Sequence, residues 1–456
     1  MNGSRNRISS RHSAILLGIA IALMVPVILF TVTGFQVCLT LVVAPLAALA
    51  LLRAPSLLRN LFLASVATGA ISIGLALWVL GDQFRVRYVL SLLLIMTPPL
   101  YFFLGWYLCA RVVAFERLLM ILGAVSAAFV SALAIEAVVT GSQVRWYTGS
   151  YGATVLNVDF LGLPIYGSYG VLSLVSLILV QMFVIGAAFI GATERWLRWG
   201  LLFGFGAAAF LLTGSNARSP QLVLPCLVGL LGLAALFGRP AIRGKAAVLL
   251  VVCLVATTYS VVRMVEPLRI VTTVKELLHI REGRPSDATS SAKASSRSSS
   301  RRAILVPDTE AETEAPIDFE SLSTGRQSLL QDALAEVKLS PIFGNGFASF
   351  GRLDPSVGAR SALSGNRTAH VQYLTILWKG GLLFFLPYMA LLIAFWLRAI
   401  RGLLGARRED VLLVSIGLIF LFTILSVSWD ILLVPSAGAL GFFLLGAVSE
   451  STRRTG

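Results

Sequence analysis

A few ionisable residues lie next to the ends of long apolar runs in this sequence. Arg218 follows the run that ends in LLTG, and His370 directly precedes the run that begins at residue 371. Arg326 falls in the first turn of a predicted helix, where the free backbone N–H groups and the guanidinium could bind an anion together. We therefore interpret Arg326 as a candidate phosphate ligand, and Arg218 and His370 as candidate functional residues. The alternative interpretation is that the arginines are interfacial or surface cations and that the lone histidine is structural.

Three further charged residues could support such a site. Arg263 lies near the end of an apolar run, where contact with lipid headgroups is the simpler interpretation, and Asp430 lies in the short connection SVSWDI. Lys379 lies well inside the run that begins at residue 371, at a depth of roughly 12 Å in a continuous helix. There its ammonium could pair with a carboxylate such as Asp430 or Glu136, or extend toward the membrane surface.

The sequence lacks the motifs of soluble enzymes and of metal sites. Gly344, Gly346 and Gly351 in FGNGFASFG form neither a dinucleotide-binding G-x-G-x-x-G motif nor a P-loop. The cysteines lie inside apolar runs, without a second Cys or a His at the spacing of metal ligands. We therefore predict neither a metal site nor a bound cofactor.

The composition excludes a soluble globular protein. Of the 456 residues, 57% are hydrophobic and only 13% are charged, and the mean hydropathy is +0.85. Soluble domains are about 25% charged. The formal net charge of +15 could indicate nucleic-acid binding, but in a membrane protein it usually reflects cytoplasmic loops. Because the longest loop is nearly balanced in charge, we predict no nucleic-acid partner.

The apolar runs predict an all-α integral membrane protein with about twelve transmembrane helices. Each run can cross about 30 Å of hydrocarbon as a helix, which also satisfies the backbone N–H and C=O groups. Nine of the predicted helices fall in residues 1–264 and three in residues 371–456. The runs are 14–33, 36–52, 61–80, 88–110, 118–139, 165–191, 197–213, 220–237, 246–264, 371–397, 411–428 and 431–449.

The positions of Lys and Arg orient these helices. When the N-terminus is placed in the cytoplasm, most basic residues of the short loops fall on the cytoplasmic side. Both termini are then inside, and the long segment 265–370 faces outward. In this loop, the Ser-rich residues 285–302 predict disorder. Apolar residues at helical period predict an amphipathic helix over 324–340, which could lie on the bundle at the outer membrane surface.

Three stretches, taken together, resemble the O-antigen ligase and O-antigen polymerase family of polyprenyl-diphosphate-dependent glycan transferases. LLTGSNARSPQL (211–222) is similar to the family's arginine motif after a spanning helix. STGRQSLLQDALAEVKLSPIFGNGFASF (323–350) is similar to its Gly-Arg, amphipathic-helix and Gly-x-Gly pattern. AHVQYLTILWKGGLLFFL (369–386) is similar to the histidine motif that opens a span, although the family's Asn after the histidine is Val371 here.

The resemblance implies an inverting glycosyltransferase of the bacterial inner membrane whose active site faces the periplasm. Its donor would be a glycan on undecaprenyl diphosphate, which is a substrate and not a cofactor. Arg218 and Arg326 would hold the diphosphate, and His370 would be the general base. The acceptor would be a lipid A core sugar, as in a ligase of lipopolysaccharide biosynthesis, or a second lipid-linked glycan, as in a polymerase of O-antigen or exopolysaccharide.

Two other classes of protein remain open from the residues alone. A transporter or flippase for lipid-linked or anionic substrates would use the same outward arginines, but it should also carry polar pairs near the bilayer midplane. There the sequence offers only Lys379. A non-catalytic assembly protein would not require two arginines and a histidine together.

Overall fold

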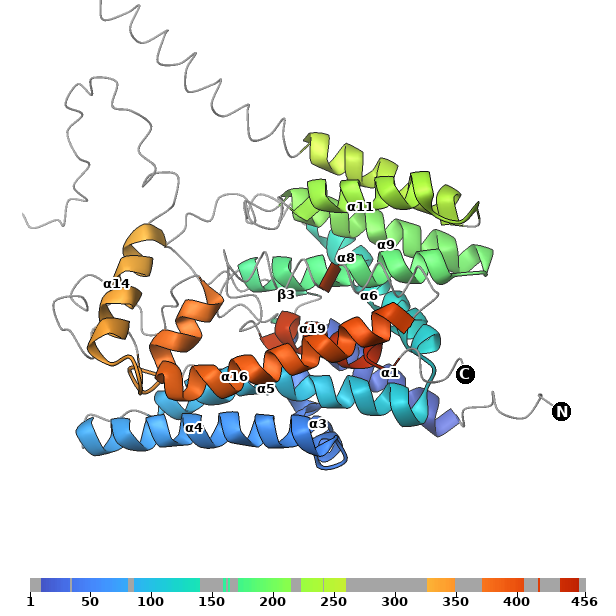
Figure 1. Cartoon of the computed structure of the whole chain (residues 1–456). Coiled ribbons are helices and arrows are strands. Elements are labelled where there is room, and N and C mark those ends of the chain that lie inside the picture. The colour runs from blue at the N-terminus through green and yellow to red at the C-terminus, as the bar shows by residue number, and fades with distance from the viewer. Residues whose placement is uncertain are drawn as a thin grey trace, which may run out of the picture.

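A computed structural model of the chain shows a bundle of long apolar helices (Figure 1). It describes residues 10–32, 35–80, 86–139, 159–160, 163–164, 171–214, 223–240, 242–259, 326–348, 371–405, 417–418 and 435–450. Within these ranges, seven helices are long and apolar enough to cross a membrane, and shorter apolar helices accompany them. The molecule is therefore a mostly helical membrane protein.

The helices follow the apolar runs over most of their length. They are α1 (Ser10–Met24), α2 (Leu39–Val42), α3 (Ala44–Leu52), α4 (Ser56–Leu80), α5 (Arg87–Tyr107), the π-helical turn η2 (Leu108–Val112), α6 (Phe115–Val139), α8 (Val171–Gly191), α9 (Arg195–Gly214), α11 (Val223–Phe237), an unlabelled helix Ile242–Tyr259, α14 (Arg326–Leu339), α16 (Gln372–Gly405) and α19 (Pro435–Val448).

The first predicted span differs from the structure. Instead of a helix over 14–33, α1 ends at Met24 and an antiparallel hairpin follows, formed by β1 (Ile28–Val32) and β2 (Phe35–Cys38). Pro26 cannot continue the helix, and the β-branched and aromatic residues after it favour a strand. A second small hairpin joins β3 (Asp159–Phe160) and β4 (Leu163–Pro164). Two short hairpins therefore interrupt the predicted all-α architecture.

The core is centred on α8, whose side chains are buried almost throughout. α8 packs against α6, α9 and α19, and α19 lies along α5. Glycines allow α5 and α19 to approach closely: a Cβ at Gly105 would meet the Phe443 carbonyl oxygen at 1.9 Å, and one at Gly446 would meet the Phe102 carbonyl oxygen at 2.0 Å. Such small-residue contacts are typical of packed membrane helices.

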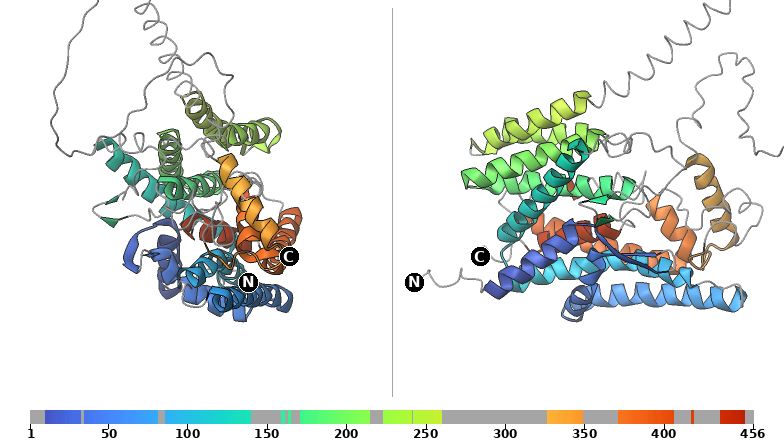
Figure 2. Two further views of the ribbon diagram at one scale, coloured as in Figure 1. Left: turned by 90° about the vertical axis from the view of Figure 1, so that its left-hand side faces the viewer. Right: turned by 180° about the vertical axis from the view of Figure 1, so that it is seen from behind.

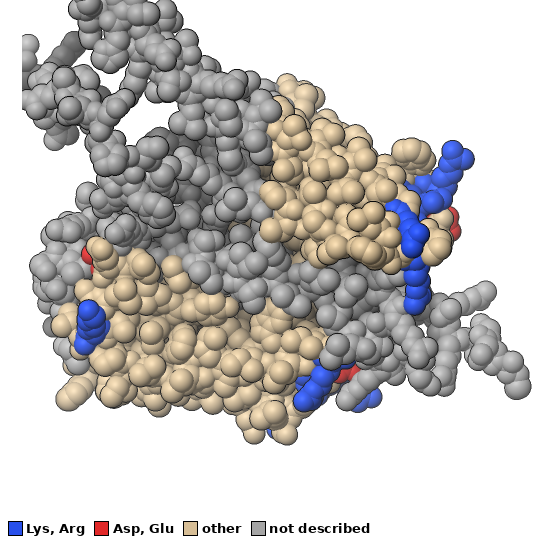
Figure 3. Space-filling view, turned by 45° about the horizontal axis from the view of Figure 1, so that its top comes forward, with Lys and Arg blue, Asp and Glu red and all other residues tan. Residues whose placement is uncertain are grey.

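The two ends of the bundle differ in charge. Lys and Arg side chains of the described residues gather mostly at one end, on the right in Figure 3, and α14 lies at the other end. At this end, connections join α3 to α4, η2 to α6, α8 to α9, and α11 to the helix after it. The basic residues in these connections or in the adjoining helix ends are Arg53, Arg59, Arg111, Arg117, Arg195, Arg198, Arg239, Arg243 and Lys245. The structure therefore has a basic end and an α14 end.

Candidate functional site

α16 is not a continuous helix but two segments joined at Gly381. This residue has φ 63° and ψ −176°, a conformation that is essentially restricted to glycine. The first segment, 372–380, turns away from the rest of α16 and lies beside α14 at the end of the bundle (Figures 1 and 2). Broken helices in membrane proteins leave backbone groups that must find partners elsewhere.

The turn that follows α14 supplies these partners. Leu382 and Leu383 donate their N–H groups to the carbonyl oxygens of Pro341 and Ile342, both at 2.9 Å. In the other direction, Asn345 and Phe347 donate to the carbonyl oxygens of Trp378 and Lys379, both at 3.0 Å. The turn and the broken helix therefore hold each other by four backbone hydrogen bonds.

The Gly-x-Gly pattern gives this turn its shape. Gly344, Gly346 and Phe347 all have positive φ, between 63° and 65°. A Cβ on Gly344 would come within 2.4 Å of the Gly381 nitrogen, so the two backbones could not approach with a larger residue. Phe347 is almost fully buried despite its strained conformation, and its ring packs edge-on against Phe384, with 5.2 Å between centroids.

A buried polar network lies where α14, the turn and α16 meet. The Trp378 indole donates to Glu336 Oε2 at 2.5 Å, and the Asn345 amide donates to the same oxygen at 3.4 Å. Lys379 Nζ donates to the Ala348 carbonyl oxygen at 3.3 Å and lies 4.8 Å from the centroid of the Trp378 ring. These side chains are buried, so polar groups taken out of water are paired with one another.

α14 packs against the first segment of α16 through a small apolar contact. Ala333 and Val337 of α14 contact Leu374 and Trp378. α14 ends at the turn, the first segment of α16 ends at the break, and the turn and the break are hydrogen-bonded to each other. The two segments therefore run in the same direction and begin on the same side (Figure 2). The N-terminal ends of both helix segments, where the helix dipole is positive, therefore face the same side.

The predicted site residues can be placed on this frame only in part. Arg326 is the first residue of α14, and Val371, which follows His370, directly precedes α16. The structure therefore brings the backbone of Arg326 to the same side as the start of α16. Arg218, Arg263, His370 and Asp430 lie outside the described residues.

The structure adds contacts of Lys379 that the sequence did not predict, while its expected pairing with Asp430 or Glu136 stays a prediction. α16 breaks two residues after Lys379, at Gly381. Lys379 therefore belongs to the segment packed against α14. Its contacts with Ala348 and Trp378 lie within this end of the bundle.

Sequence reasoning missed Glu336, Asn345 and Trp378 as parts of the site. Glu336 lies on a predicted amphipathic helix, where a carboxylate is expected to face water, but it is fully buried. One signal could have indicated the break: the Gly380–Gly381 pair directly after Lys379 in an otherwise apolar run. Nothing in the local pattern indicates that the Gly-x-Gly turn is the partner of that pair.

A comparison with protein families finds a match in this region. Residues 201–389 match the family model described as O-antigen ligase. The match contains all of α11, α14, the Gly-x-Gly turn and the break in α16. It also contains the Arg218, Arg326 and His370 positions of the three motifs. A search of curated proteins found no significant match. The chain is thus a membrane protein whose residues 201–389 are similar to the O-antigen ligase family.

Proposed function

We propose that the protein transfers a glycan from undecaprenyl diphosphate to the hydroxyl of an acceptor sugar, with inversion at the anomeric carbon. The observation that carries this proposal is the O-antigen ligase match over residues 201–389, which includes two arginines and one histidine in the order of the family's motifs. The parallel arrangement of α14 and the first segment of α16 supports it, since Arg326 begins one segment and His370 precedes the other.

In the proposed step, His370 accepts the proton of the acceptor hydroxyl while its oxygen attacks the anomeric carbon. The bond between that carbon and the diphosphate oxygen breaks, and undecaprenyl diphosphate leaves with the electron pair. Arg218 and Arg326 stabilise the charge that develops on the leaving group. The N–H groups at the start of α14 add to this stabilisation. The residues alone supply acid–base and electrostatic catalysis, so we propose a metal-independent reaction without a cofactor.

The proposed topology has about twelve transmembrane helices in the bacterial inner membrane, with both termini in the cytoplasm. The basic end of the bundle faces the cytoplasm, as the excess of Lys and Arg there favours. The α14 end and the loop 265–370 then face the periplasm, where a lipid-linked donor would be presented. Arg263, Lys379 and Asp430 are the proposed supporting residues at this end.

A reconstituted transfer assay tests the proposal. Purified protein receives a lipid-diphosphate-linked oligosaccharide in the absence of added metal and nucleotide, with lipid A core or excess donor as acceptor. We expect His370→Ala to lower the rate by about 10²–10⁴-fold, the usual contribution of a general base. We expect Arg218→Ala and Arg326→Ala to lower it by roughly 10²–10³-fold. His279→Ala and Arg401→Ala serve as matched controls and should retain activity.

The acceptor that is used separates a ligase from a polymerase. Transfer to lipid A core indicates a ligase, and extension of the donor glycan indicates a polymerase. Full activity of a folded His370→Ala variant would remove this residue as the base. If the wild-type protein transfers to neither acceptor but moves the lipid-linked glycan across the bilayer, the protein is a flippase.

A further inference from the structure

In the segment from Leu334 to Phe343, polar side chains are buried and apolar side chains exposed in the opposite way to that expected for a segment in water. Its carboxylate, Glu336, is fully buried, whereas Leu339, Ile342 and Phe343 are 57%, 54% and 43% exposed. Leu334, one turn before Lys338, is 43% exposed. Clusters of large exposed apolar side chains mark contact surfaces, and a surface that is apolar outside and polar inside fits a lipid environment.

This apolar surface continues the side of α16 that faces away from the bundle. Leu382, Leu386, Ile393 and Leu397 are all exposed and recur at helical spacing along the second segment of α16. The hydrogen bonds from Leu382 and Leu383 to Pro341 and Ile342 fix the turn to the beginning of this segment. The exposed apolar residues of the turn therefore lie next to the start of this exposed apolar side of α16.

The level of the turn in the membrane follows from the length of that segment. From the break to Gly402, α16 is about 31 Å long at 1.5 Å per residue, which matches the roughly 30 Å of hydrocarbon. Its first residues thus lie at the boundary between acyl chains and headgroups. Ser72 of α4 donates a hydrogen bond to the Phe343 carbonyl oxygen at 2.7 Å, so a second long apolar helix holds the turn.

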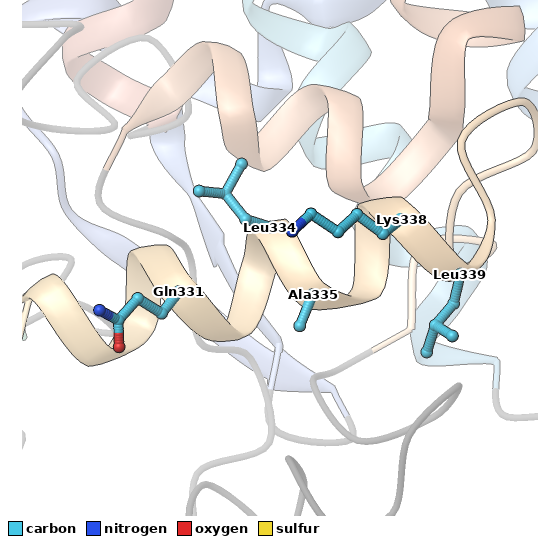
Figure 4. Close-up of a pocket in the computed structure, with 5 residues that line it drawn as sticks. All are labelled: Gln331, Leu334, Ala335, Lys338 and Leu339. Carbon is cyan, nitrogen blue, oxygen red and sulfur yellow. The ribbon is translucent and has the colours of Figure 1, made fainter.

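The outer face of α14 beside the turn combines apolar and basic groups. Gln331, Leu334, Ala335, Lys338 and Leu339 line a shallow groove there, with a volume of about 460 Å³ (Figure 4). Lys338, an exposed cation, lies between the apolar residues Leu334 and Leu339 of this groove. An ammonium at the edge of an apolar surface is the arrangement by which interfacial helices bind phosphate headgroups.

We propose that this segment is a lipid-binding element that enters the leaflet at the α14 end of the bundle. Leu339, Ile342 and Phe343 lie among the acyl chains, and Lys338 contacts phosphate headgroups. The first half of α14, which carries Gln331, stays in water. The proposal concerns how the segment is anchored and does not depend on which reaction the protein catalyses.

Spin labels report directly on this placement. Cys226 is the exposed cysteine among the four and is replaced by serine, while the buried cysteines remain. Single cysteines are then introduced as Leu339→Cys, Ile342→Cys and Phe343→Cys, with Leu386→Cys as the lipid-facing reference and Gln331→Cys as the aqueous one. In liposomes that contain anionic phospholipid, collision with oxygen is compared with collision with a water-soluble nickel chelate.

We expect the ratio of oxygen to nickel accessibility at Ile342 and Phe343 to approach that at Leu386 and to exceed that at Gln331 several-fold. A ratio like that of Gln331 at all three positions would place the turn in water and overturn the proposal. Low accessibility to both reagents would show that protein covers the surface, either another part of the chain or a second copy, and would overturn it as well. Using three positions separately prevents a single perturbing label from deciding the outcome.

Discussion

Glu336 shows how a single buried carboxylate can organise the end of a membrane bundle. Burying a carboxylate is costly unless hydrogen bonds compensate for lost hydration. Here one oxygen accepts hydrogen bonds from the Trp378 indole and the Asn345 amide. The three residues come from α14, the turn and α16, so one side chain links all three parts of the candidate site.

Replacing Glu336 with leucine should destabilise the protein by about 1–3 kcal/mol, because the Trp378 and Asn345 donors would lose a buried acceptor. Glu336→Gln keeps an acceptor oxygen and should have a smaller effect. The measurement is thermal unfolding in detergent micelles, with the exposed Gln331→Leu on the same helix as the control. Equal midpoints for Glu336→Leu and Gln331→Leu would show that the network adds no stability.

A double-mutant cycle tests the contact between Glu336 and Trp378 separately. Trp378→Phe removes the indole donor and keeps an aromatic ring. If the hydrogen bond is made, Glu336→Leu and Trp378→Phe should be non-additive by about 0.5–3 kcal/mol in the free energy of unfolding. Additive changes would mean that the two side chains act independently.

At the scale of elements, the apolar pattern predicted where helices occur better than how each one runs. The pattern predicted a single span over 371–397, and the structure has a long helix there that breaks at Gly381. The break depends on the 341–347 turn, which lies more than thirty residues earlier in the chain and leaves no trace in the periodicity of α16. Similarly, hydropathy could not separate α1 from the hairpin after it, since strands and helices here are equally apolar.

Gly381→Ala should be strongly destabilising. The residue has φ 63°, and a Cβ would meet the Ile342 carbonyl oxygen at 2.2 Å and the Gly344 nitrogen at 2.4 Å. The backbone conformation alone costs about 1–3 kcal/mol for other residues. Gly74→Ala in α4 is the matched control: its Cβ would meet nothing within 4 Å, and alanine favours the helix by roughly 0.5–1 kcal/mol. Thermal unfolding of both variants measures this difference. Equal unfolding midpoints would contradict the prediction.

At the scale of the whole molecule, charge separates the two ends of the bundle. The basic end and the α14 end lie on opposite sides, and composition and loop charges already predicted this asymmetry from the sequence. The contacts within the α14 end were beyond prediction, because they join residues that are distant in the chain. For the candidate site, the roles of the residues that the sequence singled out stay predictions. The structure adds the contacts between α14, the turn and the start of α16.

Cysteine labelling from one side of the membrane tests this asymmetry. In a Cys226→Ser background, Gln331→Cys should react with a membrane-impermeant maleimide in intact cells whose outer membrane is permeabilised. Arg239→Cys, exposed at the basic end, should react only after the inner membrane is opened. Labelling of both positions in intact cells would contradict the proposed orientation.

The four backbone hydrogen bonds across the break in α16 also bear on the kinetics of hydrogen exchange. The amides of Asn345 and Phe347 lie in a turn and those of Leu382 and Leu383 at the start of a helix segment, where amide protons usually exchange quickly. Because each of these amides donates a hydrogen bond to the other segment, all four should be protected from exchange. They should become exchangeable together, in one opening event that separates the turn from α16. The break would then be a folded cooperative unit and not a hinge.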